Sequence, residues 1–387
     1  MKNKITEIIW WESCITEHQI HTLSELSKFS NVKLFVYAER LNDSSRQIQG
    51  WTECDWSLID IEVIPAPKYR YIFKVLKNKK NHTHVFGGPF DSLLISSALF
   101  LSSFMGLKTY ILTEPYLTIP SNLLSDKNKF TNWVLSKIRP IKYKILWTLL
   151  KNKINGVFAI SSTAIQQLKS IGLMYDKIFP FAYFIPTSKS LLKNNLLRNI
   201  SSSDNILRIV FIGNVIHTKG IDIAINTVNK VNSLSTKVIL DVYGPYSKKN
   251  KYAWSSSVRY QGLIPFGEAQ HKIQNYDLLI LPSRYDGWGV VINEAILAKV
   301  PVICSNQAGA SSFVKKWGCG LCYESSNEYE LKEHLENIHS NKEDILINLR
   351  SNIQKAADAI SPKMGAKFIL SSIQSDIKTN KENSWYV

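Results

Sequence analysis

The stretch LLILPSRYDGWGVVINEAILAKVPVIC, Leu278–Cys304, carries the strongest fold signal in this chain. It predicts a buried strand, a loop with two glycines, a helix and a second buried strand, in that order. Asp286 lies on the loop, and Glu294 lies on the helix eight positions later. Gly287 and Gly289 leave room for a phosphate to approach the backbone N–H groups at the helix start. Acids near a helix start also favour the helix alone, but the complete order of strand, glycines, acids and helix indicates a ligand site.

Length and composition indicate a globular protein of two domains. The chain has 387 residues, of which 45% are hydrophobic. Its first residues lack the basic-then-apolar layout of a signal peptide. Five cysteines, an odd number, form no disulfide framework, and Cys319 and Cys322 are predicted to be reduced thiols at a strand edge. These features favour the cytoplasm.

Strand-like and helix-like runs alternate on both sides of the opening stretch, which predicts parallel sheets covered by helices. The strands predicted in the first half are Ile5–Trp11, Val32–Ala38, Ile59–Ile64, His84–Phe86, Thr109–Leu112 and Val157–Ile160. Helices are predicted between them at His18–Phe29, Asp91–Met105 and Thr163–Ile171. The second half repeats the pattern with strands Leu207–Ile212, Val238–Tyr243, Leu278–Leu281 and Val300–Cys304, and with a helix at Ile221–Val231.

This alternation predicts two Rossmann-like domains that face each other across a cleft. The expected division is an N-terminal domain at 1–188, a polar linker at 189–205, a C-terminal domain at 206–360 and a final helical segment at 361–387 that packs back on the N-terminal domain. Ligands of such sheets bind at the C-terminal ends of the strands. Neither half has a Gly-x-Gly-x-x-Gly fingerprint after its first strand, which argues against a nicotinamide or flavin dinucleotide.

The strong excess of positive charge calls for an anionic partner, unless it only solubilises the protein. There are 47 Lys and Arg against 31 Asp and Glu, a net charge of +16. Six basic residues and no acid lie between Lys68 and Lys80, and eight lie between Lys127 and Lys153, where they alternate with apolar residues and Pro140 is expected to kink or split the segment. A basic, Trp-containing amphipathic helix is typical of a membrane surface, although a core helix with a basic rim has the same pattern. No nucleic-acid-binding motif is visible, so nucleic acid is not an expected partner.

A third residue joins the two acids as a candidate for phosphate chemistry. Lys219 follows the first strand of the second half, beside Gly220, where its ammonium can neutralise a departing diphosphate. Glu294 is an acceptor-only group and can take two hydroxyls, as on a ribose, and Asp286 can take the hydroxyls of a second sugar.

Several segments of the second half together resemble the retaining GT-B glycosyltransferases of family 4, the glycosyl transferases group 1. They are FIGNVIHTKG at Phe211–Gly220, VYGP at Val242–Pro245, YQGLIP at Tyr260–Pro265 and DLLILPSRYDGWGVVINEAILA at Asp277–Ala298. The resemblance covers roughly Leu207 to Ile373. It implies a GT-B fold and transfer of a sugar from a nucleotide-sugar donor, with retention and without a metal or other cofactor.

The resemblance also implies roles for individual residues on the donor side. Glu294 binds the ribose and Asp286, where the family usually has Glu, binds the transferred hexose. Gly287, Trp288, Gly289 and Val290 line the diphosphate and the sugar, and the nucleobase lies near Gly244, Leu263 and Ile264. Lys219 is the second member of a basic pair whose first member is replaced by Asn214, with His217 or Arg284 as candidates to compensate. Arg259 either contributes to the base site or forms a structural pair.

The first half resembles the family only in its alternation of strands and helices. Glu114 stands where the family often has a His, and it either acts in the cleft, on the acceptor proton or the donor hydroxyls, or is an ordinary loop carboxylate. Acceptor contacts are expected from Glu12, His18, His21, Gly87 and Gly88, although a lone His is more often structural.

These observations lead to one expected function and two alternatives. We expect a hexosyltransferase, peripheral on the cytoplasmic face of the plasma membrane, that glycosylates a saccharide acceptor, most simply a lipid-linked one, in bacterial surface polysaccharide synthesis. Glu114, Lys219 and Asp286 are its expected catalytic residues. The first alternative is a nucleotide-sugar epimerase or a phosphorylase on the same fold. The second is a basic protein that binds membrane or nucleic acid without chemistry.

Overall fold

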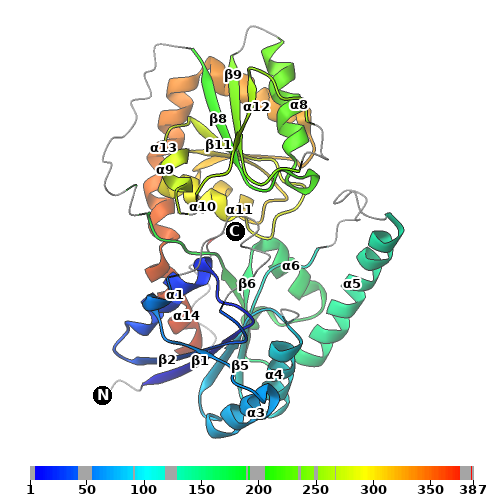
Figure 1. Cartoon of the computed structure of the whole chain (residues 1–387), viewed down its shortest axis with the longest axis vertical. Helices are drawn as coiled ribbons and strands as arrows, with labels where there is room; N and C mark the ends of the chain where they lie inside the picture. The colour runs from blue at the N-terminus through cyan, green and yellow to red at the C-terminus, as the bar shows by residue number, and fades with distance from the viewer. Residues whose placement is uncertain are drawn as a thin grey trace.

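The computed structural model describes residues 5–41, 55–89, 92–117, 129–188, 191, 205–233, 237–247, 252–265, 267–374 and 385. Within 129–136 the description is limited to the backbone. Two parallel sheets, each flanked by helices, lie one above the other in Figure 1, and the N-terminal sheet is the lower one. The predicted fold class, two Rossmann-like α/β domains, is confirmed. The linker predicted at 189–205 lies outside the described residues except for 191 and 205.

The N-terminal sheet has seven strands in the order β3-β2-β1-β4-β5-β6-β7. Their bounds are β1 Thr6–Glu12, β2 Val32–Ala38, β3 Ile61–Val63, β4 Thr83–Phe86, β5 Lys108–Thr113, β6 Gly156–Ile160 and β7 Ile178–Phe181. Strands β4 and β6 are buried along their whole length, because helices cover both faces of the sheet. All six strands predicted for this half are present, with ends that differ by two residues at most, and β7 was not predicted.

In the described part of the first half of the chain, five helices flank this sheet. They are α1 Glu17–Ser27, α3 Lys68–Asn78, α4 Leu93–Phe104, α5 Lys129–Leu150 and α6 Ser162–Ser170. Of the two expected effects of Pro140, a kink or a split, the split is wrong, because α5 continues through this proline. The missing N–H of a proline costs one intrahelical bond. Burial of Leu146, Trp147 and Leu150 holds the last turns of α5 against the sheet.

The C-terminal sheet has six strands in the order β10-β9-β8-β11-β12-β13. Their bounds are β8 Leu207–Ile212, β9 Val238–Tyr243, β10 Val258–Gly262, β11 Leu278–Leu281, β12 Val302–Ser305 and β13 Gly320–Tyr323. The flanking helices are α8 Ile221–Asn232, α9 Ala269–Ile273, α10 Val290–Leu297, α11 Ser311–Trp317, α12 Glu328–Ser340 and α13 Lys342–Ala359. The opening stretch of the sequence is thus β11, a loop, α10 and β12, as predicted.

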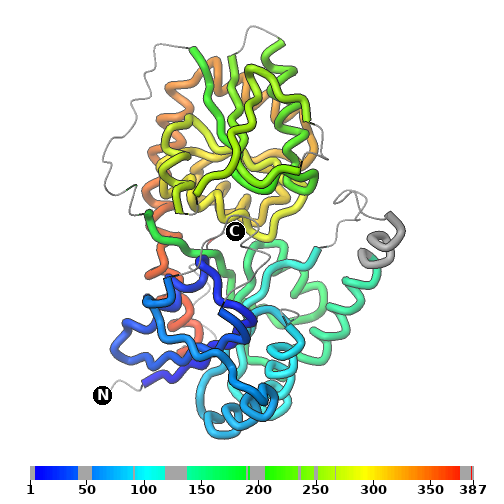
Figure 2. Tube along the Cα trace, viewed as in Figure 1, coloured from blue at the N-terminus to red at the C-terminus, as the bar shows by residue number. Residues whose placement is uncertain are grey.

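The chain crosses back to the N-terminal domain after α13. Helix α14, Pro362–Gln374, packs against α1, and Figure 2 shows this red segment beside the blue start of the chain. Lys108 Nζ donates to the Ile373 carbonyl at 2.7 Å, and Gln374 Nε2 donates to Thr6 Oγ1 at 2.7 Å. These contacts join the last described helix to both β1 and β5, so the two ends of the chain support one domain.

Candidate functional site

The strand C-termini of the two sheets surround a cleft that contains two adjoining cavities. The larger, about 820 Å³, is lined mainly by the N-terminal domain, and the smaller, about 350 Å³, mainly by the C-terminal domain. The residues that line both cavities are His18, Lys219, Asp286, Gly289 and Val290. The predicted donor residues and the predicted acceptor residues therefore face one continuous space.

The smaller cavity gathers most of the predicted donor-side residues. Those that line it are Asn214, Gly244, Leu263, Ile264, Gly289, Val290 and Glu294, together with Lys219 and Asp286. They come from the loops after β8, β9, β10 and β11 and from α10, all at one edge of the sheet. A cavity of this size with apolar walls and a few polar groups suits a nucleotide-sized ligand.

Glu294 lies in the second turn of α10, and its carboxyl borders the smaller cavity. Burial raises the pKa of this carboxyl from its ordinary 4.5 to about 7. The helix begins after Gly289, whose φ of +91° favours glycine. A Cβ at Gly289 would also lie 2.7 Å from Leu281 Cδ2, so a side chain is excluded by space as well as by conformation. The start of α10 consequently presents bare backbone N–H groups to the cavity.

Lys219 and Asp286 come from two different loops and form an ion pair. Lys219 Nζ lies 2.6 Å from Asp286 Oδ2, and both side chains are largely buried. Lys219 ends a 3-10 turn, His217–Lys219, and the following Gly220 has φ +66°. The Asp286 loop is fixed by backbone bonds, since its N–H donates to the Gln307 carbonyl at 3.1 Å. The two predicted catalytic residues of this domain are thus in direct contact.

Neither candidate for the missing cation lies in the cleft. Arg284 makes a bidentate ion pair with Asp222, with both bonds at 2.7 Å, and also donates to the His217 carbonyl at 2.8 Å. Neither Arg284 nor His217 lines either cavity. Arg259 likewise forms a bidentate pair with Asp241, at 2.7 and 2.9 Å, which decides in favour of the structural alternative for this residue.

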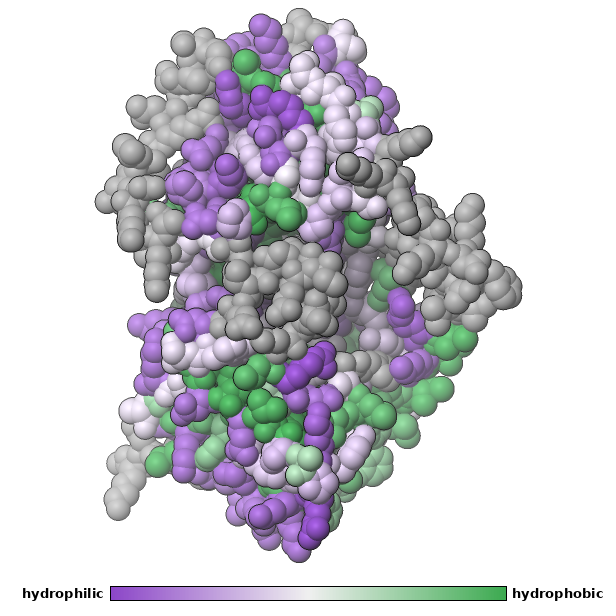
Figure 3. All heavy atoms as spheres, viewed as in Figure 1, coloured by the Kyte–Doolittle hydropathy of each residue, from purple (hydrophilic) through white to green (hydrophobic). Residues whose placement is uncertain are grey.

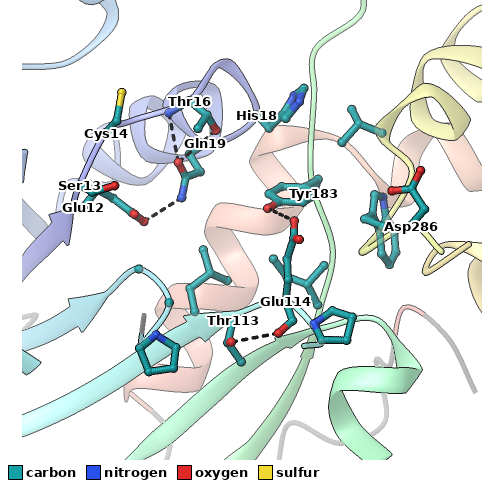
Figure 4. Close-up of a pocket in the computed structure, with 18 of the residues that line it drawn as sticks. Glu12, Ser13, Cys14, Thr16, His18, Gln19, Thr113, Glu114, Tyr183 and Asp286 are labelled. Atoms are coloured by element: carbon teal, nitrogen blue, oxygen red, sulfur yellow. Dashed lines mark hydrogen bonds between the residues drawn. The ribbon is translucent and has the colours of Figure 1, made fainter. Parts of the chain in front are cut away.

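The larger cavity brings together the predicted acceptor residues Glu12, His18, Gly87 and Gly88, as well as Glu114. Figure 4 shows Glu12, His18 and Glu114 converging on it from β1, α1 and the end of β5. The buried Glu12 carboxylate accepts from Gln19 Nε2 at 2.7 Å and from Trp10 Nε1 at 3.1 Å. His21, in contrast, pairs with Glu17 at 2.9 Å and lines neither cavity.

Glu114 reaches across the cleft to the loop between β11 and α10, which contains Asp286 and Gly287. Its Oε1 accepts from the Tyr183 hydroxyl at 2.5 Å, and its Oε2 lies 2.4 Å from the position of a Cβ on Gly287. Only a glycine at 287 therefore accommodates this carboxylate without a shift. Glu114 accordingly faces the cleft, between the sugar-binding loop predicted around Asp286 and the larger cavity.

Trp288, predicted to line the donor, is almost fully buried, although it contributes to the larger cavity. Its Nε1 donates to Asn293 Oδ1 at 2.8 Å, and Asn293 Nδ2 donates to the Tyr183 carbonyl at 2.6 Å. Asn293 and Tyr183 thus connect α10 to the N-terminal domain, and neither was predicted from the sequence. Asn293 could have been found from the sequence, because it directly precedes the predicted site residue Glu294. Tyr183 offered no such signal, because it follows β7, an edge strand that was not predicted.

The described residues contain no group of three or more His, Cys, Asp or Glu side chains placed to hold a metal ion. In the same part of the chain, no helix is long and apolar enough to span a membrane. Cys304 and Cys322 lie on neighbouring strands as free thiols with their sulfurs 3.6 Å apart, and Cys319 is buried beside them. Cys322 lies on the edge strand β13 and Cys319 directly before it, both as free thiols, as predicted.

Comparison with known proteins relates the C-terminal half to one family. Residues 194–359 match the family model described as glycosyl transferases group 1. Among related sequences, the uncharacterized glycosyltransferase MJ1178 of Methanocaldococcus jannaschii is 28% identical over 35% of this chain and 38% of its own length. The putative teichuronic acid biosynthesis glycosyltransferase TuaC of Bacillus subtilis is 30% identical over 28% of this chain and 26% of its own. The chain thus spans less than half the length of these relatives.

Solved glycosyltransferase structures match nearly the whole chain in fold. A glycosyltransferase from Rickettsia africae has a TM-score of 0.69 at 13% identity and covers 97% of this chain and 100% of its own. The lipopolysaccharide outer core galactosyltransferase WaaB has a TM-score of 0.63 at 14% identity, with coverage of 95% and 99%. HepE of Anabaena in complex with UDP-glucose has a TM-score of 0.62 at 14% identity, with coverage of 94% and 98%. Residues 194–359 are thus similar to the glycosyl transferases group 1 family, and the chain has the two-domain GT-B fold.

Proposed function

We propose that this protein transfers a hexose from a nucleotide-diphosphate sugar to a hydroxyl of a saccharide acceptor, with retention of anomeric configuration. The observation that carries the proposal is the convergence of Lys219, Asp286 and Glu294 around the start of α10, at the point where two cavities of different character meet. A lysine, a helix N-terminus and two carboxylates match the diphosphate and the two sugars of such a donor.

In this proposal the donor lies in the smaller cavity, with its sugar pointing toward the larger cavity. The base lies against the backbone of Gly244, Leu263 and Ile264, and the ribose hydroxyls donate to Glu294. The diphosphate then reaches the start of α10 and Lys219, which places the hexose at Asp286 and the junction with the larger cavity. UDP and glucose are bound by HepE, a protein with the same fold, which supports a donor of this class.

Two carboxylates and one ammonium then surround the reacting bond. As the bond between the sugar C1 and the phosphate oxygen breaks, the electron pair stays on the diphosphate, where Lys219 and the α10 dipole stabilise it. The acceptor oxygen attacks C1 from the same face and releases its proton. Glu114 lies opposite Gly287, where it can bind hydroxyls of the sugar or receive this proton.

The acceptor occupies the larger cavity, which is wide and mostly polar. Its carboxylate and glycines, Glu12, Gly87 and Gly88, suit the hydroxyls of a saccharide. Relatives and fold neighbours named for lipopolysaccharide and teichuronic acid synthesis support an acceptor in bacterial surface polysaccharide assembly. We propose that this acceptor is lipid-linked and is glycosylated at the cytoplasmic face of the membrane.

An exposed face of α5 supports the membrane part of this proposal. Four apolar side chains spaced three or four positions apart are exposed, at 51, 60, 59 and 50%: Ile138, Ile141, Ile145 and Leu149. Basic side chains lie beside them at Lys137, Arg139, Lys142 and Lys144. Figure 3 shows apolar surface at the right edge of the N-terminal domain, where α5 runs. A stripe of this kind flanked by cations favours an anionic lipid surface.

Transfer is tested with purified protein and a panel of UDP-, GDP-, ADP- and TDP-sugars. A thermal-shift screen identifies the donor, because a bound ligand raises the melting temperature by mass action. We expect nucleoside diphosphate release that depends on an added saccharide acceptor. An isomerised donor formed without acceptor would indicate an epimerase, sugar 1-phosphate formed from a saccharide and inorganic phosphate would indicate a phosphorylase, and no nucleotide binding at all would refute the proposal.

Membrane docking is tested by flotation with vesicles of neutral or anionic lipid. We expect flotation that needs anionic lipid, weakens with salt and is lost in an Ile141→Glu/Ile145→Glu variant. A matched control, Tyr329→Glu/Ile347→Glu, places the same two charges on exposed positions of the C-terminal domain. If both variants lost flotation equally, the loss would be explained by the change in net charge, and docking through α5 would be contradicted.

A further inference from the structure

One N-terminal residue lies where the two cavities meet. Of the five residues that line both, Lys219, Asp286, Gly289 and Val290 belong to the C-terminal domain, and His18 is the fifth. The bond that breaks in the proposed reaction lies at this junction, since it links the diphosphate on one side to the sugar on the other. The inference below rests on that proposed function.

His18 is held at this position by a rigid element. It is the second residue of α1, whose start is fixed by a capping box between Thr16 and Gln19. Ile20 and Leu23 are fully buried and anchor the helix to the sheet. The His18 ring also packs on the Tyr183 ring, with centroids 5.6 Å apart. Figure 4 shows the imidazole on the side of α1 that faces the C-terminal domain and Asp286.

Without His18, the proposed donor site has too little positive charge for a diphosphate. Lys219 is already neutralised by Asp286 at 2.6 Å, and Asn214, which also lines the smaller cavity, carries no charge. Arg284 is held by Asp222, away from both cavities. A diphosphate carries at least two negative charges, so the lysine and the helix N-terminus alone leave it incompletely matched.

Few basic side chains are placed to fill this gap. In the described parts of the chain, the basic residues that line the two cavities are His18, Arg40 and Lys219. Arg40 borders only the larger cavity, on the acceptor side. His18 is consequently the one of these residues that can approach the diphosphate from the N-terminal domain.

We propose that His18 donates a hydrogen bond from its imidazole to a phosphate oxygen of the donor and so completes a clamp whose other half is Lys219. Because the two halves belong to different domains, binding of the diphosphate draws them together. The same contact stabilises the charge that grows on the diphosphate when the sugar leaves. His18 is thereby a catalytic residue that contacts the leaving group, rather than an acceptor contact.

The test compares binding of a nucleoside, its monophosphate and its diphosphate by calorimetry, using the uridine, guanosine and adenosine series. His18→Ala should weaken the diphosphate about tenfold or more while nucleoside binding changes less than about threefold, as expected for one hydrogen bond to a charged group. His18→Gln keeps an N–H donor and should retain part of the affinity. The matched control is His21→Ala, three positions along α1 and outside both cavities, which should behave as the wild type.

Kinetics separate this role from an acceptor contact. We expect His18→Ala to lower kcat and to leave the acceptor KM within about threefold, since lost contacts to the leaving group act in the transition state. Unchanged diphosphate affinity, equal weakening of all three ligands, or a rise confined to the acceptor KM would each overturn the inference. The proposed function survives those outcomes provided that the wild-type protein binds a nucleoside diphosphate and transfers sugar, whereas a wild type that does neither would overturn both.

Discussion

Replacement of Glu294 by Gln is expected to make the protein more stable and a poorer binder of its donor. Burial raises the pKa of this carboxyl from 4.5 to about 7, so the folded state disfavours its charged form. A raised carboxyl pKa reduces stability as pH rises through the interval from 4.5 to about 7, and the whole penalty is present above it. Glutamine has nearly the same shape and no charge to bury.

The size of the stability change follows from the pKa. At about 1.36 kcal/mol per pKa unit, the rise corresponds to roughly 3 kcal/mol at most, and the opening of Glu294 to the cavity reduces this to about 1–3 kcal/mol. Glu294→Gln should therefore melt a few degrees above the wild type at pH 8, at about 2–4 °C per kcal/mol for a domain of this size. Toward pH 4, where this carboxyl is mostly protonated in both the folded and the unfolded protein, the difference should become small.

Donor binding should change in the opposite direction. A hydrogen bond to a charged group contributes about 1.5–3 kcal/mol, so loss of the carboxylate should raise the Kd of the nucleoside diphosphate about 10- to 150-fold. Wild-type affinity should also fall as pH drops below about 7, because the protonated carboxyl accepts fewer hydrogen bonds. The variant should lack this pH dependence.

The assay is calorimetric titration and thermal melting of both proteins from pH 4 to 8. Glu333→Gln, an exposed position on α12, is the control for loss of one negative charge and should change neither quantity. A variant that is no more stable at pH 8, or that binds the nucleoside diphosphate as tightly as the wild type, would refute the assignment of Glu294 as a buried carboxylate that holds the ribose.

Three further substitutions test other contacts of the cleft. Lys219→Ala should weaken nucleoside diphosphate binding about tenfold or more and nucleoside binding little, and equal losses by calorimetry would remove Lys219 from the phosphate. Gly287→Ala places a methyl group 2.4 Å from Glu114 Oε2, so kcat should fall while the melting temperature changes little. In a background that already carries Glu114→Ala, Gly287→Ala should cause no further fall in kcat. If the effects of the two substitutions on kcat were fully additive in this double-mutant cycle, the contact between positions 114 and 287 would be contradicted. Gly220→Ala should cost more than about 2 kcal/mol of unfolding free energy, because φ is +66° and the new methyl would lie 1.8 Å from the Pro282 carbonyl oxygen; an unchanged denaturation midpoint would contradict this.

The central strands were predictable because each carries its own signal. Strands β2, β8, β9 and β11 begin and end at the predicted residues. Strands β8, β9 and β11 are mostly buried, and β2 is buried in its second half, so all four appear as largely apolar runs in the sequence. The unpredicted strands β7, β10 and β13 all lie at sheet edges, where one side lacks a partner strand and the pattern is weaker. Strand β10 is mostly exposed, and β7 contains Pro180.

Site residues that lie close together in the sequence were predictable, whereas contacts between distant segments were not. Asp286 and Glu294 belong to one strand, loop and helix, so their common placement at the cleft follows from the order of residues alone. The exclusion of Arg284 from the cleft did not follow, because it depends on an ion pair with Asp222 on another element. Arg284 is adjacent to the donor loop in sequence, and only packing shows that its side chain is held elsewhere.

The sequence by itself determined the class of fold and pointed to the edge of the C-terminal sheet at which the smaller cavity lies. These depend on hydrophobic periodicity and on glycines and acids within a few residues of one another. Tertiary structure alone decided the ion pair of Lys219 with Asp286 within the C-terminal domain. It also decided the approach of Glu114 to Gly287 across the cleft and the place of His18 at the junction of both cavities. These contacts join residues that are far apart in the chain, and those across the cleft also depend on how the two sheets are placed relative to each other, which no local sequence pattern encodes.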